Sequence, residues 1–483
     1  MFSEEMFANR AVFDNVWWRT GKVASEFENA QSRLYLDEFY RNVTNLDVHR
    51  AMLLIGPRRV GKTWLLHHTI RKLLAAGTEP NHIMFFSVDI PVYHGMSLEE
   101  LVQHGARIAN VDEKTERLYV FFDEIQYLKE WENHLKTMVD SYPNIRFVAS
   151  GSAASILSKG ARESGAGRIS DHLLSPLTFH EHLVLTGNAA ALTERTLENG
   201  VTIPYVGDIE GFNRVFLDYL NFGGYPELVF NASEREETRR YIQRDIVDKI
   251  LLRDLPSLYN IHDVRELQSF FSYLAFHSGM VHSLEALSKG SGIPKYSINQ
   301  YMQYLEEAFL ISRLDRVDVT AMGLKRATQF KLYLTNSSLR AAMFQPIQPE
   351  QEPYFGHMVE TAVSEQFGLG EDRGCLRYAH WKTSRTEYEV DFVRLDPGRQ
   401  VPVSALEVKW SDAPFERPDR LAGAIAFAQR NDLKRLTVTS RTKLGVRHVG
   451  DIEITYVPTA LYAAAATMPL MIDEAGGPGQ AHT

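Results

Sequence analysis

The clearest chemistry in this sequence lies in residues 52–63, MLLIGPRRVGKT. A short apolar run leads into Gly-x-x-x-x-Gly-Lys-Thr, and apolar residues then recur at helical spacing from residue 64 onward. A strand, a glycine-containing loop and a helix in this order are typical of a loop that binds the phosphates of a nucleoside triphosphate. Glycine lets the backbone curl round a phosphate, and the first helical turn presents N–H groups and a positive dipole end to it. The residues predicted to contact ATP are Gly56, Pro57, Arg58, Arg59, Val60, Gly61, Lys62, Thr63 and Trp64.

Four side chains are predicted to handle the charge of the nucleotide and of its metal ion. Lys62 is expected to reach the β- and γ-phosphate oxygens, and the Thr63 hydroxyl is expected to bind Mg²⁺. Downstream, the apolar stretch 118–122 ends in Asp123 and Glu124. At the carboxyl end of a parallel strand, Asp123 would hold Mg²⁺ through water and Glu124 would polarise the attacking water. The sequence therefore predicts ATP and Mg²⁺ as cofactors.

Two further polar positions are candidates for the same site. Ser150 follows the apolar stretch 145–149, and either it or Ser152 could sense the γ-phosphate or simply cap the next helix. Arg162 and Arg168 lie in a stretch that is rich in small residues. An arginine offered to the nucleotide of a neighbouring subunit would stabilise charge in the transition state. We assign this role to Arg168 and interpret Arg162 as a solvated surface residue.

A second group of charged residues lies toward the carboxyl terminus. Glu407 and Lys409 alternate with apolar residues, so they share one face of the predicted strand 405–409. Asp391 falls on a neighbouring strand, and Glu360 falls on a predicted helix. Asp391 and Glu407 would hold Mg²⁺ for the hydrolysis of a phosphodiester. Glu360 would complete the metal shell, and Lys409 would orient or deprotonate water.

Two other interpretations of this group stay open. Glu407 and Lys409 could form an ion pair on a solvent-facing strand edge. The domain could also keep the shape of such a site and use it for binding alone.

The elements that must position these residues suggest an α/β protein of several parts. Strands alternate with helices around the phosphate loop, which predicts βαβ units and a parallel sheet with the nucleotide at the carboxyl ends of the strands. Later, three helical patterns followed by a hairpin are typical of a winged helix. Such a domain can contact DNA or serve only as a protein–protein spacer, and Glu306 and Glu307 on its last helix favour the spacer. Residues 186–215 show little periodicity and are interpreted as a connector or lid insertion. The predicted parts are a helical lead-in (1–48), a P-loop ATPase domain (49–200), a helical lid (201–262), a winged-helix domain (263–345), a C-terminal α/β domain (346–462) and a disordered tail (463–483).

The motifs together resemble a known family. The phosphate loop, Phe122–Gln126 and Ser150–Ser152 are similar to motifs of bacterial and archaeal AAA-type ATPases that carry a nuclease-like C-terminal domain. Further similar segments are Gly167–Ile169, Leu174–Glu181, Phe222–Glu227 and Arg253–Leu255. The resemblance extends from about residue 50 to residue 460, and it implies an AAA-type domain and the order of domains given above.

The C-terminal group resembles the Asp…Glu-x-Lys site of the restriction-endonuclease-like fold, which implies that fold for residues 346–462. Val390 stands where a proline usually precedes the aspartate. Asn336 stands where relatives usually have an aspartate, so we carry no function to this position.

Composition limits the class of protein. The 483 residues, 44% of them apolar, suffice for two to four domains. A formal net charge of −9 argues against a protein that coats nucleic acid non-specifically, although it permits a local basic groove. The single cysteine, Cys375, fits a reducing compartment, and we find neither a signal-peptide pattern nor an apolar run of membrane-spanning length. We therefore expect a soluble cytoplasmic protein with no membrane partner.

Two main hypotheses of function follow. In the first, ATP hydrolysis repositions the lid and winged helix of a homo-oligomer and presents a Mg²⁺-dependent nuclease centre to nucleic acid, with DNA as the expected partner in processing or defence. In the second, the chain is a nucleotide-switched signalling or scaffold ATPase whose C-terminal domain binds nucleic acid or a protein without cleaving. A DNA-binding regulator acting through the winged helix is a third possibility.

Overall fold

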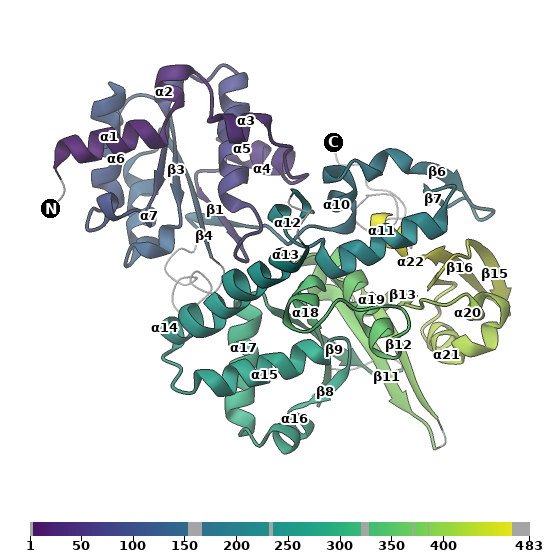
Figure 1. Cartoon of the computed structure of the whole chain (residues 1–483). Helices are drawn as coiled ribbons and strands as arrows, with labels where there is room; N and C mark the ends of the chain where they lie inside the picture. Colours follow the sequence, from purple (N-terminus) through teal and green to yellow (C-terminus); the bar gives the residue numbers. More distant parts are fainter. Residues whose placement is uncertain are drawn as a thin grey trace. The chain divides into compact units, whose positions relative to one another are not determined.

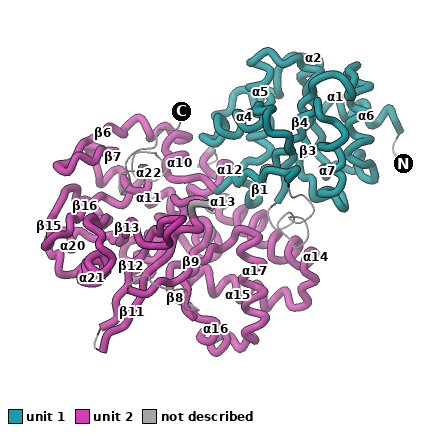
Figure 2. Tube along the Cα trace, turned by 180° about the vertical axis from the view of Figure 1, so that it is seen from behind, with its two compact units in different colours: residues 1–175 teal, residues 176–483 magenta. Residues whose placement is uncertain are grey.

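The computed structural model describes residues 3–152, 167–230, 235–319, 328–369, 371–384 and 386–465. The chain divides into two compact units, Met1–Ser175 and Pro176–Thr483 (Figure 2). Residues 176–200, which the sequence suggested to be part of the P-loop domain, belong to the second unit. Arg162 and most of the predicted tail lie outside the described residues.

The first unit is built on a five-stranded parallel sheet with the order β2-β3-β4-β1-β5 (Figure 1). Every residue of β1, β3 and β4 is buried, as expected for parallel strands that are covered on both faces. The predicted P-loop parallel sheet is thereby confirmed. Its elements are α1 (Glu4–Asp14), α2 (Trp17–Thr20), α3 (Ser25–Asn29), α4 (Leu36–Thr44), β1 (Ala51–Gly56), α5 (Lys62–Ala75), β2 (Ile83–Ser87), α6 (Leu98–Ala109), β3 (Leu118–Asp123), α7 (Trp131–Ser141), β4 (Ile145–Ser152) and β5 (Ile169–Leu173).

The helical lead-in is confirmed, and it packs against the edge strand β2. The Asn15 side chain exchanges hydrogen bonds with the backbone of Phe85, donating at 2.9 Å and accepting at 2.6 Å. The indole N–H groups of Trp17 and Trp18 both donate to the Ile83 carbonyl. Side chains thus satisfy backbone groups that an edge strand would otherwise leave unpaired.

The second unit contains a nine-stranded sheet with the order β15-β16-β14-β13-β12-β11-β9-β10-β8 (Figure 1). Its strands are β8 (Val281–Ser283), β9 (Ile311–Val317), β10 (Gln329–Leu334), β11 (Leu376–Lys382), β12 (Glu387–Leu395), β13 (Pro402–Glu407), β14 (Arg435–Ser440), β15 (Gly445–Val449) and β16 (Ile452–Pro458). A parallel pairing of β9 with β11 joins the two parts that the sequence suggested to be separate domains, 263–345 and 346–462. One sheet therefore runs across that predicted boundary.

Helices and a small hairpin complete the second unit. They are α10 (Phe179–Leu185), β6 (Thr193–Thr196), β7 (Thr202–Tyr205), α11 (Ile209–Phe222), α12 (Pro226–Phe230), α13 (Arg235–Tyr241), α14 (Leu255–Tyr259), α15 (Val264–Phe276), α16 (Leu284–Ser291), α17 (Lys295–Glu307), α18 (Ser338–Met343), α19 (Tyr354–Gln366), α20 (Ala413–Glu416), α21 (Ala422–Arg430) and α22 (Thr459–Ala465). Two π-helical segments, Ile242–Asp248 and Ile250–Asp254, lie between α13 and α14. Among the described residues, the helices lack the combination of length and apolar character needed to cross a bilayer.

Residues 186–215, interpreted as a connector or lid insertion because they show little periodicity, contain regular elements. The structure contains the β6–β7 hairpin and the start of α11 there. All four residues of β6 are exposed, so the strand needs no apolar alternation that a sequence pattern could reveal. In contrast, the apolar face expected between residues 235 and 258 is confirmed, because Ile242, Ile246 and Leu251 are buried.

The segment Phe222–Glu227 packs against the loop that contains Asn336. The Gly224 carbonyl accepts a hydrogen bond from the Leu177 N–H at 2.9 Å. A Cβ at Gly224 would lie 2.0 Å from the Asn336 Oδ1 atom. The Asn336 amide has little freedom to move, because it donates to Glu365 at 3.0 Å and its oxygen accepts from Ser338.

We expect Gly224→Ala to lower the free energy of unfolding by about 1–3 kcal/mol, since the added methyl group overpacks a site whose neighbour is pinned. Chemical denaturation of the full chain would measure this. Gly290→Ala is the matched control, because a Cβ there meets nothing within 4 Å and alanine favours the helix α16. Equal stability of the two variants would contradict the packing argument.

Candidate functional site

The phosphate loop leaves β1 at the carboxyl edge of the first sheet and runs directly into α5. Gly61 and Arg59 have left-handed backbone conformations, with φ of +94° and +66°, which fold the loop back on itself. The Lys62 ammonium donates to the carbonyls of Gly56 at 3.0 Å and Pro57 at 2.9 Å. Burial lowers the pKa of Lys62. The loop thus holds a buried ammonium whose hydrogen bonds go to carbonyls of the loop itself.

Two contacts fix the loop from outside. A Cβ on Gly56 would lie 2.4 Å from the carbonyl oxygen of Leu174, so the first glycine is required by the close approach of the chain after β5. The Arg33 guanidinium donates to the Val60 carbonyl at 2.6 Å and to the Ser175 carbonyl at 2.9 Å. Sequence analysis missed Arg33, which no motif distinguishes from other arginines of the lead-in.

The predicted metal-binding side chains of the ATP site meet at the carboxyl ends of β3 and β4. The Thr63 hydroxyl donates to Asp123 Oδ2 at 2.7 Å, and the Ser150 hydroxyl donates to Oδ1 of the same carboxylate. Burial, and then the neighbouring Glu124, raise the pKa of Asp123 to about 6. A hydroxyl beside a buried carboxylate fits the oxygen ligands that Mg²⁺ prefers. Ser150 therefore supports Asp123, an arrangement that neither of its predicted roles included.

Glu124 adopts a left-handed conformation, with φ of +55°, directly after Asp123. The Gln126 side-chain amide donates to its carboxylate. Glu124 thus follows Asp123 at the carboxyl end of β3, close enough to Lys62 for its charge to oppose the lowering of the pKa of that ammonium.

Trp64 lies next to the phosphate loop, whereas Arg168 lies at the opposite edge of the sheet. Trp64 follows the loop on α5, is 41% exposed and packs edge-on against Phe27. Arg168 lies at the amino edge of the sheet, where its carbonyl accepts from the Ala51 N–H, and its guanidinium pairs with Asp140 at 2.8 Å. Within the chain, Arg168 is therefore not brought to the phosphate loop.

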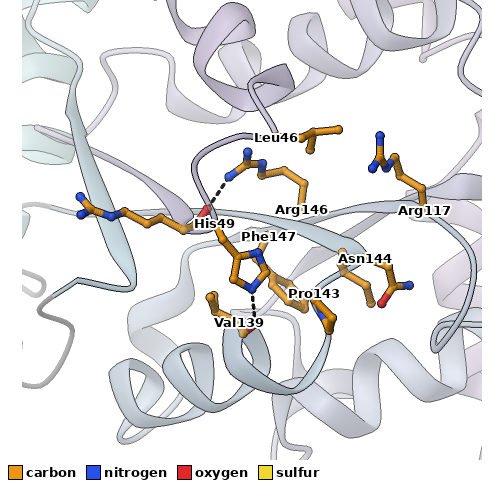
Figure 3. Close-up of a pocket in the computed structure, with 10 residues that line it drawn as sticks. Leu46, His49, Arg117, Val139, Pro143, Asn144, Arg146 and Phe147 are labelled. Carbon is orange, nitrogen blue, oxygen red and sulfur yellow. Dashed lines mark hydrogen bonds between the residues drawn. The ribbon is translucent and has the colours of Figure 1, made fainter.

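A small polar cavity of about 60 Å³ lies at the amino ends of β1 and β4 (Figure 3). Arg146 lines it and donates to the carbonyls of Val48 and Arg50, and a His49 ring nitrogen lies 2.8 Å from the Val139 carbonyl. This volume is large enough for a few water molecules. Because the cavity lies at the edge of the sheet opposite to the phosphate loop, it is not part of the nucleotide site.

The second predicted group converges in the second unit, from α19, β12 and the end of β13. Asp391 is at its centre, where Oδ2 lies 3.6 Å from the Lys409 ammonium and accepts from the Val408 N–H at 2.8 Å. Lys409 also pairs with Glu407 at 2.7 Å. Glu360 joins through a residue that sequence analysis missed, Lys331. The four predicted side chains therefore gather at one place, which we call the acidic centre.

Three further residues complete the acidic centre. The Lys331 ammonium lies 2.5 Å from Glu360 Oε1, 2.5 Å from Glu389 Oε1 and 3.2 Å from Asp391 Oδ1. The Tyr333 hydroxyl donates to Glu360. The spacing of these residues in the sequence could have revealed them, because residues two positions apart in a strand lie on the same face. Lys331 and Tyr333 share a face of β10 in this way, and Glu389 shares a face of β12 with Asp391.

Burial and charge set the protonation of the acidic centre. Burial raises the pKa of Glu360 to about 8 and that of Glu407 to about 7. Burial also opposes ionisation of Asp391, but Lys409 and Lys331 together lower its pKa to about 2. Oxygen atoms of Glu360, Glu389 and Asp391 lie within 4.8 Å of one another, a spacing that fits a metal ion with oxygen ligands.

Comparisons with known proteins agree with the site in the first unit. Residues 48–183 match a family described as an AAA domain, and residues 213–350 match a domain of unknown function. A protein of Haemophilus influenzae described as uncharacterized is 23% identical over 305 residues, covering 61% of this chain and 69% of the relative. Two proteins of Methanocaldococcus jannaschii with the same description are 25% and 26% identical, covering 59% and 61% of this chain and 60% and 62% of their own lengths.

The Aeropyrum pernix Orc1 protein, solved in complex with DNA, aligns with a TM-score of 0.30 and 11% identity over 67% of this chain and 94% of that chain. The phosphate loop, its paired acids and the match over residues 48–183 together identify this region as an AAA-type P-loop ATPase domain.

Proposed function

We propose that the protein couples ATP hydrolysis in its first unit to metal-dependent cleavage of nucleic acid, with DNA as the expected substrate, at the acidic centre of its second unit. The observation that carries the proposal is the convergence of Glu360, Asp391, Glu407 and Lys409 around one point.

In the ATP step, a water molecule attacks the γ-phosphorus and the bond to the β,γ-bridging oxygen breaks. Glu124 accepts the proton of that water, and Lys62 stabilises the charge on the phosphate oxygens. Mg²⁺, held by Thr63 and Asp123, would neutralise the charge that develops on the leaving diphosphate. Arg168 would contribute only across a contact with a neighbouring subunit.

In the cleavage step, a water molecule attacks the phosphorus of a phosphodiester and the bond to one ester oxygen breaks. Lys409 orients this water, whose proton passes to solvent, while the departing ester oxygen takes a proton from solvent. A divalent ion bound by Asp391, Glu407 and Glu360 would stabilise the additional negative charge of the transition state.

The order of elements from α15 to β10 supports a contact with nucleic acid. Helix, strand, two helices and a two-stranded hairpin follow one another, and β8 pairs with β10, as in a winged helix. Lys295 and Tyr296 open α17, and Tyr296 is 74% exposed. These side chains are candidates for contacting a DNA groove.

The alternative of a nucleotide-switched scaffold ATPase is favoured by a different observation. Lys331 and Lys409 already neutralise much of the charge of the carboxylates, so the acidic centre has internal partners and could be a structural ion network.

One assay separates the two functions. The purified chain would be incubated with single- and double-stranded DNA and RNA, with Mg²⁺, Mn²⁺ or EDTA, and with or without ATP. Metal-dependent strand cleavage supports the proposal. ATP hydrolysis with no cleavage of any substrate, together with a nucleotide-dependent change in oligomer size, supports the scaffold.

A further inference from the structure

A buried ammonium lies within the acidic centre, at the position where a cation is expected. Lys331 lies on β10, the strand that pairs with β9, and its side chain is 1% exposed. The ammonium contacts Glu360, Glu389 and Asp391. These are the three carboxylates whose oxygens lie within 4.8 Å of one another.

The space among these oxygens accommodates one cation. A Mg²⁺ ion needs carboxylate oxygens at about 2.0–2.1 Å. An ammonium 2.5–3.2 Å from the same three carboxylates excludes the ion. When all four carboxylates of the centre are ionised, they and the two ammonium groups carry a net charge of −2, which one divalent ion would balance.

We infer that Lys331 is the resident cation of the acidic centre and that a divalent metal ion binds by displacing its ammonium from Glu360 and Asp391. Lys331 thereby sets the metal affinity of this site. The inference rests on the proposed function only for the location of the metal, since it concerns binding and not cleavage.

The structure offers the ammonium a partner when it leaves. Glu389 has a side chain that is 35% exposed, whereas Glu360 and Asp391 are 9% and 7% exposed. Lys331 can therefore keep its ion pair with Glu389 while it moves outward. On the other side of Asp391, the Oε2 atom of Glu407 is buried and has no hydrogen-bond partner among the described residues, so it is available to a metal ion.

Titration of the nucleotide-free full chain with Mn²⁺ tests the inference. We expect Lys331→Met to bind Mn²⁺ at least about tenfold more tightly than the wild type, because the competing ammonium no longer reduces the fraction of chains ready to bind. Lys331→Arg keeps a positive charge and should show no such gain. Unchanged or weaker binding by Lys331→Met would overturn the inference.

A second pair of variants keeps the test decisive if Lys331→Met does not fold. The single variant Glu389→Gln and the double variant Lys331→Met/Glu389→Gln differ only in the ammonium of Lys331. The double variant removes one positive and one negative charge, so it leaves the net charge of the centre unchanged. The double variant should bind Mn²⁺ more tightly than Glu389→Gln alone, and equal affinities would overturn the inference.

Cleavage is scored separately in the same preparations. Tighter Mn²⁺ binding without cleavage in any variant would refute the proposed nuclease and leave the inference intact. If the wild type cleaves and the Mn²⁺ affinity does not depend on Lys331, the proposed nuclease is supported and the inference about Lys331 is refuted.

Discussion

Glu124→Gln should lower kcat for ATP hydrolysis by about 10²–10³-fold while ATP binding is retained. The substitution keeps the size of the side chain and its contact with Gln126, but it removes the carboxylate that we propose as the acceptor of the proton of the attacking water. The contacts proposed for Lys62 with the phosphates and for Thr63 with Mg²⁺ do not use this carboxylate. Steady-state hydrolysis and equilibrium binding of a fluorescent ATP analogue would measure the two quantities.

Glu130→Gln is the matched control for this variant. Glu130 also has a left-handed backbone, with φ of +54°, and it lies exposed six residues further along the chain. The same chemical change there should leave kcat within about twofold of the wild type, as for surface substitutions that contact no substrate. A Glu124→Gln variant that kept more than about a tenth of the wild-type kcat would remove the assignment of the base.

Asp391→Asn should reduce metal-dependent cleavage of nucleic acid by at least about a hundredfold and leave ATP hydrolysis unchanged. Asparagine keeps an oxygen that can accept from the Val408 N–H, but it loses the negative charge that lies between Lys331 and Lys409. The variant therefore removes a proposed metal ligand with little change in shape. Initial rates of strand cleavage with Mn²⁺ and rates of phosphate release from ATP would be compared in one preparation.

Asp419→Asn is the control for the second unit. The side chain of Asp419 is 65% exposed and pairs with the surface residue Arg417. It should cleave like the wild type. If the wild type cleaves and Asp391→Asn cleaves equally fast, the acidic centre is not the nuclease site. If both variants lose cleavage together with their fold, circular dichroism will show it.

Much of the nucleotide site could be predicted from the sequence because its chemistry is local. The phosphate loop occupies eight consecutive residues, and Asp123 with Glu124 ends a strand whose burial is evident from an unbroken apolar run. Support from distant residues could not be predicted in the same way. Arg33 reaches the loop from 27 positions before Val60, and no local pattern encodes that contact.

In the acidic centre, too, local patterns predicted some residues, whereas a residue from a distant strand was not predicted. Alternation placed Asp391, Glu407 and Lys409 on strand faces, and helical spacing placed Glu360. The sequence did not predict Lys331 as part of this centre, because a lysine in a strand ordinarily faces water. The pairing of β9 with β11 joins β10 and its neighbours to the sheet that carries the acidic centre, and this pairing joins residues about 60 positions apart.

By itself, the sequence determined the α/β character of the chain, the AAA-type phosphate loop and the residue types of both charged groups. These features depend on periodicity and on short spacings, which the order of residues carries directly. The tertiary structure decided that one nine-stranded sheet unites two predicted domains, that Arg168 pairs with Asp140, and that an ammonium occupies the acidic centre. These outcomes depend on which strand edges meet and which charges are buried together, and both are set by the packing of the whole unit.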